Sequence, residues 1–103
     1  MKFAITTTPL GNIPPEAAEP LFQAAKQWLE DKKNDGTIDV THGFPEGGVL
    51  SIANASSHEE LMNTIRAFPL FPFTRWEIRP LVDINQSLDS AIGMFRQMAA
   101  QRS

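Results

Sequence analysis

Two sets of side chains in this sequence have the types and spacing that acid–base chemistry requires. Arg75, Glu77 and Arg79 alternate with apolar residues in "TRWEIRPLV", so a strand here places all three on one face. A carboxylate between two guanidinium groups stays ionised, which suits the anchoring of an acidic ligand more than general-base work, and Glu77 is kept as one of two candidate catalytic residues. The second candidate is a single residue, His42. It is a candidate general base because histidine ordinarily changes charge between pH 5 and 8.

Each set also has a structural explanation. His42 can be a histidine at the rim of the core with its polar edge in water. The triplet of Arg75, Glu77 and Arg79 can form a cross-strand or intersubunit ion pair, with Asp39 as a further partner. The two histidines of the chain lie in different predicted elements and the chain has no cysteine, so no metal site is expected.

The elements that position these residues follow from hydrophobic periodicity. Alternation of β-branched and aromatic residues predicts strands at 2–8, 37–44, 49–55 and 74–82. Apolar residues at helical spacing predict helices that contain 21–29, 61–68 and 84–101. The first of these helices begins at Pro20, or a short turn from Pro15 kinks there. Ser57 and Asp83 are predicted N-caps, and Gly36 is the predicted left-handed residue that ends the first helix.

This order of elements predicts an α+β fold. The sequence βαββαβ is that of the ferredoxin-like class, in which two helices cover a four-stranded antiparallel sheet. A further helix follows the last strand at 84–101. The chain of 103 residues has the length of a single domain, so residues 1–103 are taken as one unit.

Parity assigns the strand residues to two faces, provided that no bulge shifts the register. The expected helix-facing set is Phe3, Ile5, Ile38, Val40, His42, Phe44, Leu50, Ile52, Trp76 and Ile78. The expected opposite set is Ala4, Thr6, Thr8, Asp39, Thr41, Ser51, Ala53, Arg75, Glu77 and Arg79. A face of the second kind can be solvated or can meet a copy of itself, and the last helix also needs a partner surface. We therefore expect a homodimer or a higher homo-oligomer, joined through sheet faces or through the last helix.

Composition excludes several classes of function. The net charge is −3 with acids and bases scattered along the chain, which argues against a nucleic-acid partner because such proteins present a basic face. No apolar run approaches the roughly 20 residues of a membrane span, and the first residues do not form a signal peptide. The absence of cysteine excludes disulfides, so a cytoplasmic location is expected.

The stretch "AFPLFPF" at 67–73 places two prolines and three phenylalanines between a predicted helix and a predicted strand. Pro69 cannot continue the helix, so the turn that follows is stiff and apolar. Such a turn can plug the end of the core, line a ligand pocket or meet a neighbouring subunit. Phe71, Phe73 and Trp76 are accordingly candidates for the apolar part of a substrate-binding site.

At this stretch the chain resembles the muconolactone isomerase family. The resemblance is carried by "FPLFPF" followed by "TRWEI", with "DGT" before the second strand and "SHEEL" at the start of the second helix. It implies a ferredoxin-like subunit that pairs as a dimeric α+β barrel and assembles further. It also implies a proton shift along a small unsaturated lactone or organic acid, with no metal and no organic cofactor.

The hairpin "TIDVTHGFPEGGVLSIANA" departs from the family pattern because it contains no arginine and no tyrosine. A long helix also follows residue 83, where the family has a short tail. Two hypotheses follow. The protein is a cofactor-free isomerase in which His42 takes a proton beside a conjugated carbonyl. The alternative is a non-catalytic module of the same fold that binds a small ligand or serves assembly.

Overall fold

Four strands form one antiparallel sheet, as the alternation of β-branched residues predicts. The computed structural model describes residues 1–102. The strands lie in the order β2-β3-β1-β4, so the first strand occupies the interior of the sheet beside the last. Their bounds are β1 (Lys2–Pro9), β2 (Ile38–Gly43), β3 (Val49–Asn54) and β4 (Thr74–Leu81). This topology is the one that the βαββαβ order predicts.

The connections carry the helices α1 (Pro15–Asn34), α2 (His58–Arg66) and α3 (Ile84–Gln101), and a short 3-10 turn η1 (Phe71–Phe73). Helix α1 begins at Pro15 and runs through Pro20 without a second start, which settles the alternative left open by the two prolines. A proline in the first turn costs no hydrogen bond, since the amides there have no partner within the helix.

Side-chain caps begin α2 and α3 where the sequence predicts them, and Gly36, with φ of +83°, has the left-handed backbone predicted for the end of α1. The hydroxyl of Ser57 accepts a hydrogen bond from the Glu60 amide at 3.1 Å, and the carboxylate of Glu60 accepts one from the Ser56 amide. The Asp83 carboxylate accepts from the Gln86 amide at 3.0 Å. These bonds satisfy amides that lack partners within the helix, so each cap defines the first residue of its helix.

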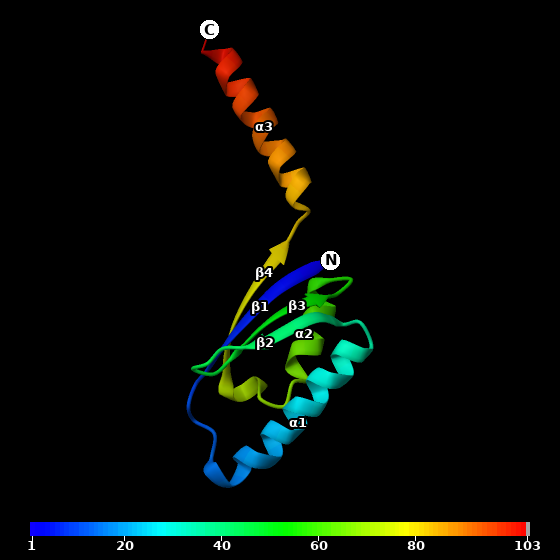
Figure 1. Ribbon diagram of the computed structural model, residues 1–103, viewed down its shortest axis with the longest axis vertical. Coiled ribbons are helices and arrows are strands. Elements are labelled where there is room, and N and C mark those ends of the chain that lie inside the picture. Colours follow the sequence, from blue (N-terminus) through cyan, green and yellow to red (C-terminus); the bar gives the residue numbers. More distant parts are fainter. Residues whose placement is uncertain (103) are drawn as a thin grey trace.

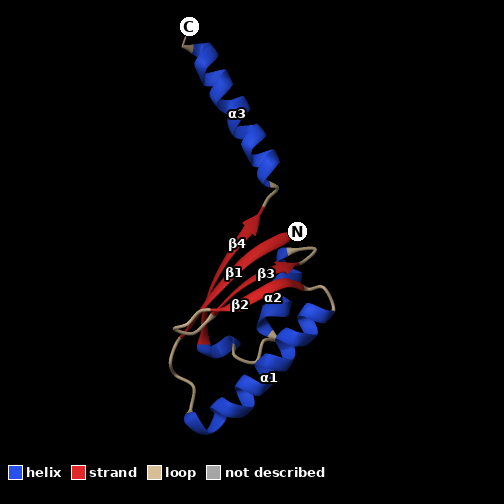
Figure 2. Cartoon of the chain, viewed as in Figure 1, coloured by secondary structure: helices blue, strands red, loops and turns tan. Residues whose placement is uncertain are grey.

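Helices α1 and α2 cover one face of the sheet, and the other face is left open (Figure 2). The core lies between them, where each buried apolar side chain stabilises the fold by about 1.5–3 kcal/mol. Phe68 packs edge-on against Trp28 of α1 and Trp76 of β4, with ring centroids 5.1 and 5.7 Å apart. The central cluster consists of Phe3, Ile5, Ala53, Ala55, Leu61 and Ile65.

The assignment of faces by parity is correct for β1 and β4 and wrong for most of β2 and β3. The register shifts between Ile38 and Val40, where a β-bulge inserts Asp39 opposite β3. Ile38 is buried under the helices, whereas Val40 and every second residue after it point to the open face. On β3, Ser51 and Ala53 are buried, and Leu50 and Ile52 therefore lie on the open face.

On β3, Ser51 and Ala53 take the core positions that Leu50 and Ile52 were predicted to fill, and the hydroxyl groups under the helices are paired. The Ser51 hydroxyl donates to the Thr41 hydroxyl at 2.8 Å, and the Val49 amide donates to the Thr7 hydroxyl, also at 2.8 Å. These pairings satisfy polar atoms under the helices, so burial of small hydroxyl residues there carries little cost.

Helix α3 projects from the end of β4 away from the sheet and from the other two helices (Figure 1). The described chain is consequently elongated, with principal extents of 69, 28 and 24 Å. Helix α3 is amphipathic, but no helix within residues 1–102 is long and apolar enough to cross a membrane.

Candidate functional site

One row of residues on the open face crosses all four strands. His42 of β2 pairs with Leu50 of β3, Leu50 pairs with Thr6 of β1, and Thr6 pairs with Glu77 of β4. Directly paired residues of antiparallel strands point to the same face. With neighbouring strands about 4.8 Å apart, the Cα atoms of His42 and Glu77 lie roughly 14 Å from each other across this row.

The prediction that His42 lies on the helix side of the sheet is therefore wrong. The β-bulge at Asp39 is the physical reason, since one extra residue reverses the facing of all later residues in the strand. His42 is exposed on the open face, so the structure offers no helix-side pocket around it. Both candidate catalytic residues, His42 and Glu77, consequently lie on the open face.

The charged residues of β4 lie on this same surface, as predicted. Arg75 and Arg79 flank Glu77 at two residues' distance on the same face, opposite Thr8 and Ala4 of β1. All three charged side chains are exposed, and within residues 1–102 Glu77 forms no ion pair with either arginine. Both guanidinium groups thus remain available to an anionic ligand.

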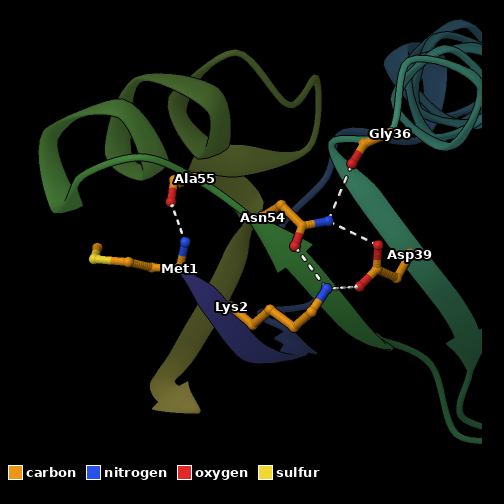
Figure 3. Close-up of polar contacts among 6 residues, drawn as sticks. All are labelled: Met1, Lys2, Gly36, Asp39, Asn54 and Ala55. Carbon is orange, nitrogen blue, oxygen red and sulfur yellow. Dashed lines mark hydrogen bonds and ion pairs between the residues drawn. The ribbon is translucent and has the colours of Figure 1, made fainter. Parts of the chain in front are cut away.

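Asp39 does not join this group, contrary to the ion pair considered from the sequence. Its carboxylate accepts from the Lys2 ammonium at 2.5 Å and from the Asn54 amide at 2.7 Å, and Lys2 also donates to Asn54 at 2.8 Å (Figure 3). The hydrogen bonds from Lys2 and then Asn54 hold the pKa of Asp39 below its usual range. Asn54 further donates to the Gly36 carbonyl at 3.1 Å.

This network of Lys2, Asp39 and Asn54 joins β1, β2 and β3 at the bulge. It keeps the extra residue in place, and the bulge in turn directs His42 to the open face. An aspartate inside a predicted strand was the sequence signal for this feature, since aspartate is depleted in strands. The network is thus a support for the site and not a part of it.

A hollow of about 510 Å³ adjoins the Glu77 end of the row. This volume falls within the range of small-ligand sites. The side chain of Glu77 lines it together with threonines of β1 and the turn between β2 and β3. No sequence motif marks the other lining residues as site residues; they are Thr6, Thr7, Thr8, Pro9, Leu10, Gly11, Phe44, Glu46 and Gly47.

The aromatic candidates lie on the other side of the sheet from this hollow. Trp76 and Phe71, with ring centroids 5.8 Å apart, are partly buried and pack against the core, so Phe71 has the first of the roles considered for its turn, a plug at the end of the core. The indole N–H of Trp76 is buried and has no hydrogen-bond partner among residues 1–102. It borders a cavity of about 30 Å³, which has room for one water molecule.

Phe73 lines a separate apolar groove of about 350 Å³ between α1 and the turn after α2. Its walls include Phe22, Leu29 and Leu70, together with the titratable side chain of Lys26. The groove contains neither His42 nor Glu77. The structure therefore separates Phe71, Phe73 and Trp76 from Arg75, Glu77 and Arg79, which the sequence had grouped as one binding site.

A four-stranded antiparallel sheet with two helices on one face and titratable groups on the other defines a small α+β protein with an open sheet face. The family model for muconolactone delta-isomerase matches residues 1–87, and the chain belongs to this family. The resemblance seen in "FPLFPF" and its surroundings is thereby confirmed. The match ends within the first turn of α3, so most of that helix lies beyond it.

Solved structures agree with this fold. Muconolactone isomerase is similar with a TM-score of 0.73 and 23% identity, over 81% of this chain and 90% of the other. The 5-chloro-2-hydroxyhydroquinone dehydrochlorinase of Burkholderia phenoliruptrix, solved with 2,5-dihydroxybenzoquinone, has a TM-score of 0.60 and 17% identity, covering 84% and 98% of the two chains. No curated protein sequence matches the chain. At these identities the structures support the fold alone.

Proposed function

We propose that this protein is a cofactor-free isomerase that shifts a proton along a small unsaturated lactone or a related organic acid. Membership of the muconolactone delta-isomerase family supports the reaction class. The observation that carries the proposal is the row on the open face, with His42 at one end and Glu77, between two arginines, at the other.

The chemistry requires a base and a cation on one surface. His42 removes a proton from the carbon next to the conjugated carbonyl, which leaves an enolate, and then returns the same proton at the far end of the conjugated system. Atoms and electrons balance within the substrate, so no other reactant is needed. Arg75 and Arg79 bind the substrate's carboxylate, and Glu77 lies between them on the same face, where its negative charge limits how many anionic groups the two arginines can accept.

A second copy of the chain would complete the site by excluding water from the open face. Val40, Leu50 and Ile52, here called the apolar strip, lie beside His42 and are all at least partly exposed. An exposed apolar surface on a sheet face, here on the edge strand β2 and its neighbour β3, favours contact with another sheet. This arrangement is the dimeric α+β barrel expected from the family resemblance, and exclusion of water strengthens the charge interactions inside it.

The test is an assay of muconolactone isomerisation, extended to simple unsaturated lactones, with the wild type and four variants. His42→Ala should lower kcat by about 10²–10⁴-fold, the usual contribution of a general base. Arg75→Ala should mainly raise KM, because it removes a contact made before and during the reaction. Glu77→Gln should raise KM less than Arg75→Ala does. The matched control is His58→Ala, since His58 lies on α2 against Phe3, with ring centroids 5.6 Å apart, and not on the open face.

Three results would change the assignment. Activity that survives His42→Ala but not Glu77→Gln would make Glu77 the base. Activity that survives both would move the site off the open face. If the wild type turns over none of these compounds, the alternative of a binding or assembly module is favoured, and the apolar groove at Phe73 becomes its candidate ligand site.

A further inference from the structure

Helix α3 presents an apolar surface that nothing in the described chain covers. Its large apolar side chains have exposed fractions between 52% and 65%, and the helix projects into solvent beyond β4 (Figure 1). In proteins most of the stability of an amphipathic helix comes from packing of its apolar face, so the apolar face of α3 calls for a partner surface. These exposed residues are Ile84, Leu88, Ile92, Met94, Phe95 and Met98.

Five residues of this surface have the spacing of a seam between two helices. They are called the α3 seam and are Ile84, Leu88, Ala91, Phe95 and Met98. Successive residues of the α3 seam are separated by four, three, four and three positions, which gives the 3.5-residue repeat of a left-handed helix pair. Ile92 and Met94 flank the α3 seam on its two sides.

The sizes of the seam residues favour an antiparallel pair of identical helices. In an antiparallel pair centred at the level of Gly93, the small Ala91 of one copy lies opposite the large Phe95 of the other, and Leu88 lies opposite Met98. A parallel pair would instead place Phe95 against Phe95 and Ala91 against Ala91. Close packing disfavours that arrangement, because one layer would be crowded and the next would contain a void.

Charge selects the same direction. Asp83 and Asp89 lie at the amino-terminal end of α3, and Arg96 and Arg102 lie at its carboxyl-terminal end. Antiparallel pairing brings the acidic end of one helix beside the basic end of the other and also opposes the two helix dipoles. Parallel pairing would bring like charges together. Because residues 84–101 contain no lysine and a single arginine, Arg96, α3 also lacks the basic face by which amphipathic helices bind anionic membranes.

We propose that α3 pairs in antiparallel orientation with α3 of a second copy of this chain. The contact is separate from the open sheet face, so it either links sheet-face pairs into larger assemblies or adds a second contact within one pair. The proposal does not rest on the proposed enzymatic function, because it uses only residues that follow the last strand. It also assigns a role to the part of the chain that extends past the family match.

Disulfide cross-linking in the full-length chain tests both the pairing and its direction, since the native sequence has no cysteine. Met94→Cys lies next to the two-fold axis of the proposed pair and should form a linked dimer under mild oxidation. Leu88→Cys and Met98→Cys should each fail to link with themselves, because like positions are about 15 Å apart along the axis. They should link when the two variants are mixed. All three positions are exposed in the single chain, so these substitutions leave its fold intact.

A matched pair of charge variants shows whether the seam drives the contact. Phe95→Glu, made in the Met94→Cys chain, should reduce linkage at least tenfold, whereas Gln97→Glu carries the same charge on the opposite side of the helix and should leave it unchanged. Linkage of Leu88→Cys with itself would show a parallel pair and overturn the proposed direction. Absence of linkage at Met94, with α3 bound to the apolar groove or to another protein, would overturn the pairing itself.

Discussion

His42 and Glu77 lie at opposite ends of one row of paired residues on the open face of the sheet, with Leu50 and Thr6 between them. The relationship depends on the β-bulge at Asp39, which turns His42 away from the helices. Without the bulge the two side chains would lie on opposite faces, and no single small molecule could contact both. The bulge is therefore the structural feature on which the proposed site depends.

The apolar strip predicts a contact between sheet faces. Ile52→Lys places a charge in the middle of the strip, so burial against a second sheet would leave that charge without a partner. Sedimentation at micromolar concentration should show that the assembly formed by this variant has a lower molecular mass than the assembly formed by the wild type. Gln23→Lys on the exposed side of α1 is the control and should sediment as the wild type does. An unchanged mass for Ile52→Lys would contradict the sheet-face contact, and cross-linking at Met94 should persist in this variant.

Gly48 is predicted to resist substitution. Its φ is +88°, and a Cβ at this position would lie 2.1 Å from the carbonyl oxygen of Thr7. Gly48→Ala should therefore destabilise the fold by about 2–4 kcal/mol, through backbone strain and displacement of β1. Urea unfolding measures this change. Gly93→Ala, in helix α3 with open space around it, should instead stabilise slightly, by about 0.5–1 kcal/mol.

Phe71 is predicted to stabilise the core through its contact with Trp76. Phe71→Ala leaves a void beside the indole ring and should cost about 2–4 kcal/mol in the free energy of unfolding. Phe22→Ala removes the same side chain from an exposed position on α1 and should cost less than about 1 kcal/mol. Equal effects of the two substitutions in thermal unfolding would show that the turn at Phe71 does not plug the core.

The bonds of Asp39 predict a dependence of stability on pH. Because Lys2 and Asn54 lower the pKa of Asp39 in the folded chain, its carboxylate contributes stability that is fully present above the unfolded pKa of about 3.9. That contribution is lost as the pH falls through the lower, folded pKa. Asp39→Asn should accordingly have a lower Tm than the wild type at pH 7, and the difference should shrink toward pH 2.5. A difference that stays constant over this range would exclude the ionised carboxylate as its source.

The sequence by itself determined the elements and their order, because these depend on local chemistry. Alternation and helical spacing placed all four strands and three helices, and the caps at Ser57 and Asp83 lie where the short-range pattern put them. The signature around residues 68–73 was also sufficient to indicate the family. Each of these signals involves residues close together in the chain, so no knowledge of distant contacts was needed.

Tertiary structure alone decided which side chains share a face. Strand parity has a period of two, so the one-residue bulge at Asp39 moved His42 and Val40 to the open face, and the pairing of β3 with β1 did the same for Leu50 and Ile52. The bonds that hold the bulge join Lys2 to Asp39 and Asn54, at sequence separations of 37 and 52 residues. Periodicity within one strand carries no information about contacts at that range, and for this reason the site could be assembled only from the folded chain.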